Sequence, residues 1–163
     1  MVETIARTIE VSEWNLDVQQ KASAFWTKHG MKMSQDDHCL SGRRGSVISV
    51  LLSSMPDAIS SQLTITSLEP TRIDCVIKAC TTFQVWCIWD RTIFDLELNL
   101  FDHFLKTGDA RDEHWERFAK TYQKHYWMAN LTGGLMGLTM SAKERSQFRA
   151  DIDVDRDASI LNG

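Results

Sequence analysis

The sequence has few of the residues that interrupt regular structure, with only two prolines and eight glycines among 163 residues. It also lacks the extremes of composition, because 43% of the residues are hydrophobic and 25% are charged. These values are close to the averages of globular domains, which excludes a disordered, collagen-like or coiled-coil chain. A chain of this length buries enough surface to form one domain.

The common catalytic signatures are absent as well. The sequence contains no G-x-G-x-x-G, no H-E-x-x-H, no G-x-S-x-G and no Walker loop, which argues against the enzyme classes that those motifs define. None of its four cysteines forms a C-x-x-C pair, so we expect reduced, mostly buried thiols rather than a metal site. We expect no metal and no cofactor; the cysteines are Cys39, Cys75, Cys80 and Cys87.

Charge and hydropathy limit the partners. Lys and Arg number 18 against 22 Asp and Glu, a formal net charge of −4, and we therefore expect no nucleic-acid partner. The first residues show no basic start followed by an apolar block, so no secretory leader is predicted. No apolar run is long enough and free enough of glycine to predict a stable membrane span. We expect a cytoplasmic protein.

Alternation of apolar and polar residues predicts strands in several places. Two such runs flank the turn residues Glu69-Pro70-Thr71, as in an antiparallel hairpin. The segment 47–55 fits a short helix slightly better than a buried strand. The predicted strands are 5–11, 37–41, 62–66 and 72–79, with an extension at 83–89.

Apolar residues at helical spacing predict helices at 13–29, 90–107 and 110–130. Ser12 is the expected N-cap of the first helix, and Gly30 is its expected stop. We therefore expect a single α+β domain over residues 1–149, with an antiparallel sheet of four to five strands and the three main helices packed on one face. Residues 150–163 are acidic and are expected to form a loose C-terminal tail.

Glu97 is the most informative residue, because helical geometry places it within the apolar arc of the helix 90–107. A carboxylate there must be paired, neutralised or exposed to a cavity. Arg7 lies on the apolar side of the first strand and is the expected partner, while His29 ends the apolar stripe of the first helix. The set is either a structural ion pair or a polar pocket in which Glu97 is an acid or base and Arg7 and His29 bind a ligand.

Arg43 and Arg44 stand between Gly42 and Gly45 and form a second candidate site. If Ser46 begins a helix, backbone N–H groups and the two guanidinium groups would bind an anion. The alternative interpretation is an exposed basic turn.

The segment 126–140 carries no formal charge, and the chain has six Trp and seven Met residues. Such residues are enriched at protein interfaces, so we expect a homodimer.

We expect a binding or interaction module with an apolar groove for a small apolar or anionic ligand or for a protein partner. The alternative is a small cofactor-independent enzyme (an isomerase, cyclase or lyase) that uses Glu97 for proton transfer. A pocket open to solvent at Glu97 favours the enzyme, and a sealed ion pair favours the binding module.

Overall fold

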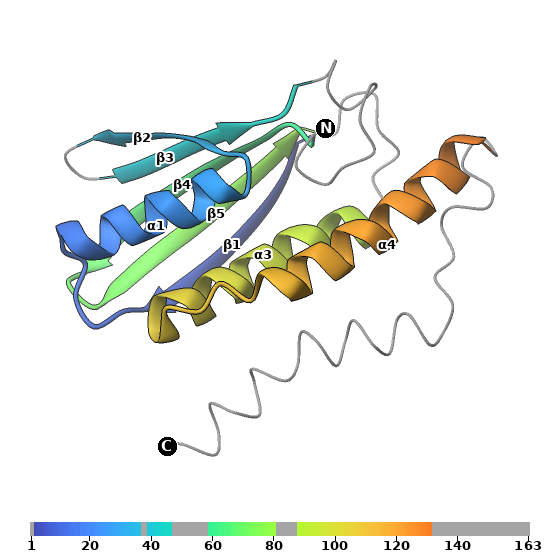
Figure 1. Ribbon diagram of the computed structural model, residues 1–163. Helices are drawn as coiled ribbons and strands as arrows, with labels where there is room; N and C mark the ends of the chain where they lie inside the picture. Colours follow the sequence, from blue (N-terminus) through green and yellow to red (C-terminus); the bar gives the residue numbers. More distant parts are fainter. Residues whose placement is uncertain (1, 37–38, 47–58, 81–87, 132–163) are drawn as a thin grey trace. The chain divides into compact units, whose positions relative to one another are not determined.

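The computed structural model describes residues 2–36, 39–46, 59–80 and 88–131 (Figure 1). These residues have the predicted α+β arrangement, with an antiparallel five-stranded sheet and three helices. No helix among them is long and apolar enough to cross a membrane. In chain order the elements are β1 (Val2–Glu10), α1 (Leu16–Lys28), β2 (Lys32–Asp36), β3 (Cys39–Arg44), β4 (Ser61–Glu69), β5 (Arg72–Cys80), α3 (Ile88–Thr107) and α4 (Asp112–Leu131).

The sheet has the strand order β1-β5-β4-β3-β2, and every neighbouring pair is antiparallel. The hairpin predicted around Pro70 is confirmed, since β4 and β5 pair on either side of it. Among the described strands, the first pairs with the last, so β1 and β2 lie at the two edges of this five-stranded sheet. As a result, β4 and β5 both separate β1 from β3.

The sheet buries one face, and α1 and α3 lie on that face (Figure 1). Strand alternation turns one apolar set inward, and the aromatic rings of the two helices meet above it. Phe25 lies 5.2 Å from Phe101, and Trp26 lies 5.3 Å from Phe101, between ring centroids. The inward-facing apolar residues of the strands include Ile5, Ile9, Leu40, Leu63, Ile65, Ile73 and Ile77.

Helix α1 begins later than the sequence suggests. Its N-cap is Asn15, whose side chain accepts a hydrogen bond from the backbone N–H of Val18, and not Ser12. The residues before it are bound to the β4–β5 turn, because the Trp14 backbone N–H donates to the Pro70 carbonyl at 2.6 Å. The predicted stop is confirmed: Gly30 has a φ of 81°, a conformation that favours glycine.

The structure extends the short strand predicted at 37–41 into a hairpin of β2 and β3. Gly42, which resembles a turn residue in the sequence, lies inside β3 and faces the core. A Cβ atom at this position would lie 2.5 Å from the Met33 Sδ atom and 3.4 Å from the Met31 Cβ atom. Gly42 therefore packs closely against the flexible side chain of Met33 inside the strand and does not form a turn. Residues 47–58, 81–87 and 132–163 lie outside the described residues, including the segment 47–55, most of the extension 83–89 and the tail.

The described residues form two compact parts, the first up to Ala110 and the second from Arg111 onward. Helix α4 belongs to the second part and corresponds to the helix predicted at 110–130. Within it, the rings of Trp115 and Phe118 are stacked 6.3 Å apart.

The two faces of β4 give a first prediction. Leu63 is fully buried, whereas Thr66 on the other face of the same strand is exposed. Leu63→Ala should lower the free energy of unfolding by about 2–5 kcal/mol, because it leaves a cavity in the core. Thr66→Ala should cost less than about 1 kcal/mol, the range of strand propensity alone. Urea denaturation of both variants measures the difference, and equal losses would contradict the assignment of the faces.

Candidate functional site

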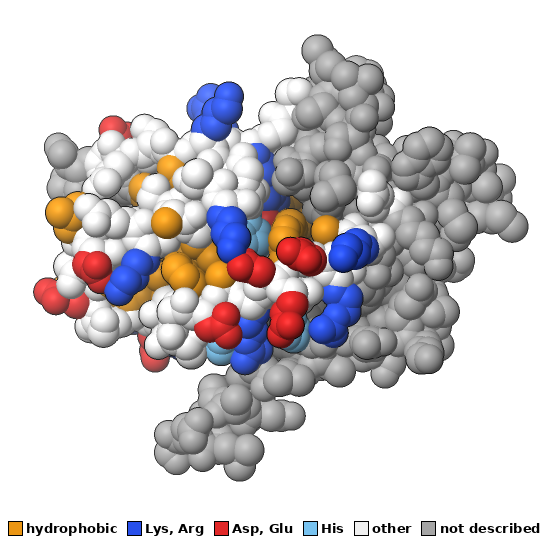
Figure 2. Space-filling view, viewed as in Figure 1, with side chains coloured by type: hydrophobic (Ala, Val, Ile, Leu, Met, Phe, Trp, Pro, Cys, Tyr) orange, Lys and Arg blue, Asp and Glu red, His pale blue; other side chains and the backbone are white. Residues whose placement is uncertain are grey.

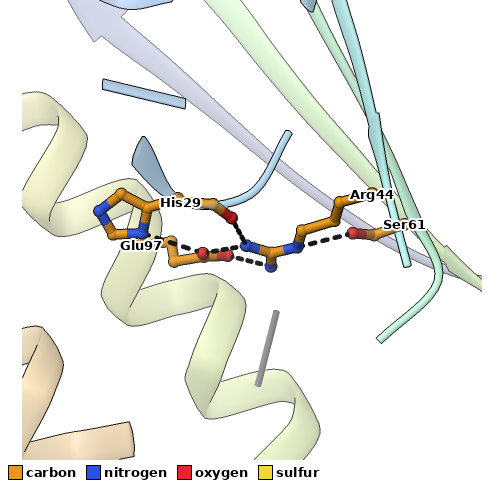
Figure 3. A network of polar contacts seen from close by, with 4 residues as sticks. All are labelled: His29, Arg44, Ser61 and Glu97. Carbon is orange, nitrogen blue, oxygen red and sulfur yellow. Dashed lines mark hydrogen bonds and ion pairs between the residues drawn. The ribbon is translucent and has the colours of Figure 1, made fainter. Parts of the chain in front are cut away.

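Glu97 lies on α3 and is fully buried, as its position in the apolar arc predicts. Its helical neighbours Leu96 and Leu98 are also buried. An isolated carboxylate in such surroundings would cost several kcal/mol. The carboxylate therefore needs partners, and the structure provides them from other elements (Figure 3).

Arg44 is the main partner of Glu97. Its Nη1 atom lies 2.5 Å from the carboxylate Oε1 atom and its Nη2 atom 2.6 Å from the Oε2 atom, a bidentate pair. The same guanidinium donates from Nη1 to the His29 carbonyl at 2.9 Å and from Nε to the Ser61 hydroxyl at 3.2 Å. Its carbon Cζ also lies 5.7 Å from the centre of the Phe94 ring. The Arg44 guanidinium group therefore has partners on several sides: a carboxylate, a carbonyl, a hydroxyl and an aromatic ring.

His29 is the second partner and caps the C-terminal end of α1. Its Nδ1 atom lies 3.2 Å from the Glu97 Oε1 atom, and its ring stacks on Phe25 with centroids 4.4 Å apart. The sequence offered His29 only as the end of a helix stripe and as a candidate ligand-binding residue, and the structure brings it into contact with Glu97. We call the residues His29, Arg44, Ser61 and Glu97 the buried network; they come from α1, β3, β4 and α3 (Figure 3).

Arg7 is not the partner of Glu97, and that pairing was wrong. The Arg7 guanidinium donates instead to the side chain of Asn99, two residues further along α3. Residues two apart on a helix point to nearly opposite sides. The strand order then determines which arginine each α3 side chain can reach, because β5 and β4 separate β1, which carries Arg7, from β3, which carries Arg44. Asn99 meets β1, and Glu97 meets β3.

The two adjacent arginines do not form one anion site or one exposed turn. They lie in β3, where alternation sends Arg43 outward and Arg44 inward. Arg43 is exposed, and the side chain of Arg44 is fully buried. The signal was present in the sequence, because Leu40, Gly42 and Arg44 follow each other at the spacing of one strand face. Gly42 and Gly45, which are typical turn residues, led instead to the prediction of a turn or a helix N-terminus.

The buried network holds Glu97 in its charged form. Burial by itself raises the pKa of Glu97, but the positive charge of Arg44 and hydrogen bonds with His29 and Arg44 outweigh this and lower the pKa below its usual value. The side chains of Glu97 and Arg44 are 0% exposed, and that of His29 is 2% exposed. The arrangement is a sealed ion pair that connects four elements.

The remaining ionisable groups of the described residues form no comparable buried cluster. Burial raises the pKa of the Cys75 thiol well above its ordinary value, so the thiol stays protonated. Cys75 and the half-buried Cys39 are both free thiols. Across the described residues, no three His, Cys, Asp or Glu side chains are grouped as metal ligands would be.

A depression of about 580 Å³ lies at the surface between α1 and the edge strand β2. The side chain of Gln35 on β2 reaches across to α1, where its Nε2 atom donates to the Gln19 Oε1 atom at 2.6 Å. We call this depression the α1–β2 groove. It is lined by Gln20, Ser23, Ala24, Thr27, Lys28 and Gln35.

Comparisons with protein-family models, with curated proteins and with solved structures found no match for this chain. Its function therefore has to be argued from the buried network, the α1–β2 groove and the exposed surfaces of the described residues.

The buried network predicts strongly coupled mutations. Arg44→Met leaves a buried carboxylate without its main partner and should lower the free energy of unfolding by about 3–5 kcal/mol. Adding Glu97→Leu should recover most of that loss, since an apolar pair of similar volume needs no partner. Arg43→Met is the matched control on the exposed face of the same strand and should change stability by less than about 0.5 kcal/mol. A double-mutant cycle with near-zero coupling would contradict the pairing.

The lowered pKa of Glu97 also predicts how stability depends on pH. A carboxyl group with a lowered folded-state pKa stabilises the fold fully above its unfolded value of about 4.3 and loses this contribution as pH falls toward the folded value. The wild type should therefore lose more stability between about pH 5 and pH 3 than Arg44→Met/Glu97→Leu. Urea denaturation at constant ionic strength tests this, and parallel curves would refute it.

Proposed function

We propose that this protein is a non-catalytic interaction module that receives an extended segment of a partner protein in the α1–β2 groove. The observation that carries the proposal is that the groove runs beside an open sheet edge, since β2 pairs only with β3 within the described part of the chain. An edge strand presents unpaired N–H and C=O groups, to which an extended peptide adds as a further strand.

The chemistry of the groove favours a peptide over an apolar small molecule. Its volume of about 580 Å³ is within the range of ligand sites. Beside its apolar surface, the lining carries the amides of Gln20 and Gln35 and the hydroxyls of Ser23 and Thr27. Amides and hydroxyls both donate and accept hydrogen bonds, as a peptide backbone requires. Lys28 adds a positive charge that favours an acidic side chain in the bound segment.

The sealed buried network supports a binding role over catalysis. Proton transfer to a substrate requires the acid or base to reach it within hydrogen-bond distance. Both oxygen atoms of Glu97 are already bound to Arg44, and its side chain has no exposed surface. A role for Glu97 as the acid or base of an isomerase, cyclase or lyase would need this ion pair to open.

We propose in addition that the protein acts as a homodimer in the cytoplasm. The uncharged segment 126–140 and the content of Trp and Met support self-association. The free thiols of Cys39 and Cys75 support a reducing compartment.

Blocking the groove tests the proposed function. Heptapeptides selected against the immobilised protein from a random display library serve as ligands for NMR titration of the ¹⁵N-labelled protein. Shifts should concentrate on Ser23, Thr27 and the residues of β2. Thr27→Trp, an exposed position, should fill the groove and weaken binding about tenfold or more, the effect of losing about 1.4 kcal/mol.

Lys21→Trp is the matched control, because Lys21 is exposed on the same helix outside the groove. It should leave the affinity for the selected peptides unchanged. Equal losses in both variants, or shifts confined to other elements, would overturn the assignment of the groove.

A further inference from the structure

The face of the sheet opposite α1 and α3 carries its side chains in rows that cross all five strands. The pairing register defines each row, because paired residues stand side by side on the same face. The first row, from β1 to β2, is Thr4, Lys78, Gln62, Arg43 and Lys32. We call it the basic row.

The next two rows along the strands differ in charge. The neutral row consists of small residues with no charge: Ala6, Val76, Thr64, Ser41 and Ser34. The acidic row consists of Thr8, Asp74, Thr66, Cys39 and Asp36. The outer face is therefore polarised along the strand direction.

The charges of these rows are available for a partner. Lys32, Arg43 and Lys78 are exposed, and no ion pair of the described residues involves any of them. Asp36 is exposed and Asp74 is half-buried, with a hydrogen bond from Thr8 at 3.4 Å. Figure 2 shows the opposite side of the sheet, where acidic and basic side chains lie close together around α1.

We propose that this outer face binds the same face of a second copy of the chain, with the two-fold axis running along the neutral row. A rotation about that axis reverses the strand direction of the second copy. It places the basic row of each copy over the acidic row of the other, and neutral row over neutral row. A two-fold axis along the strands would instead place like charges over each other. The charge pattern therefore selects one of the two face-to-face dimers.

The size and shape of the face fit a weak dimer. Five strands at about 4.8 Å spacing span about 24 Å. Along β1, the six steps from Thr4 to Glu10 span about 20 Å. Two copies would bury roughly 1,000 Å² in total, which is near the lower limit for a specific interface. The small residues of the neutral row let two sheets approach to about 10 Å.

A second copy fits this face better than a polyanion does. The basic and acidic rows lie four residues apart on each strand, or about 14 Å. A nucleic acid held on the basic row would therefore meet Asp36 and Asp74 close by, and the whole chain carries a net charge of −4. Helices α1 and α3 lie on the other face of the sheet, so this dimer leaves the α1–β2 groove open.

Charge reversal tests the proposal, which rests on the proposed self-association. Sedimentation equilibrium of the full chain in about 20 mM salt should show a dimer whose dissociation constant rises about tenfold or more in about 500 mM salt, where charges are screened. Lys32→Glu/Arg43→Glu/Lys78→Glu should be monomeric in low salt, and Asp36→Lys/Asp74→Lys should be monomeric as well. Mixing the two variants should restore a dimer, because every row then faces its opposite charge.

Lys21→Glu/Lys106→Glu/Lys120→Glu is the control, with the same change of net charge on the helices, and it should still dimerise. A dimer that persists in the triple variant of the basic row, unaffected by salt, would overturn this face while leaving the proposed homodimer standing. A wild type that stays monomeric under all conditions would overturn both. Circular dichroism of each variant confirms that the fold is retained.

Discussion

The packing of α1 and α3 on the sheet depends on the buried ion pair between Arg44 and Glu97. Each charge alone would cost several kcal/mol in the core, so neither element can bury its residue without the other. The bidentate geometry fixes α3 at one position over β3, and the contacts to His29 and Ser61 add the end of α1 and the start of β4. The buried network thus links α1 and α3 to the sheet.

The same alternation that buries Arg44 exposes Arg43 on the opposite face. This separation gives the two sides of the sheet different chemistry. The inner face of the sheet, under α1 and α3, is apolar and contains the buried network. The outer face carries charged side chains in rows across the strands. Recognition by this protein is therefore best sought at the outer face, which carries charged rows, and at the α1–β2 groove, whose lining includes amides and hydroxyls.

Local patterns predicted much of the fold. The hairpin around Pro70, the helical segments and the stop at Gly30 depend on neighbours a few residues apart. The burial of Glu97 also followed from helical periodicity, whereas its contact with His29 is seen only in the structure. The N-cap at Asn15 did not, because hydrogen bonds to the distant β4–β5 turn hold the preceding residues outside the helix.

The sequence by itself determined that the carboxylate at position 97 would lie in an apolar arc and would have to be paired with a cation, neutralised or exposed to a cavity, because helix geometry is local. It did not determine which cation. Arg7 and Arg44 both face the core, and only the strand order places β3 beside Glu97 and β1 beside Asn99. Strand order results from pairing between segments far apart in the chain, here β1 with β5, and no local pattern encodes it.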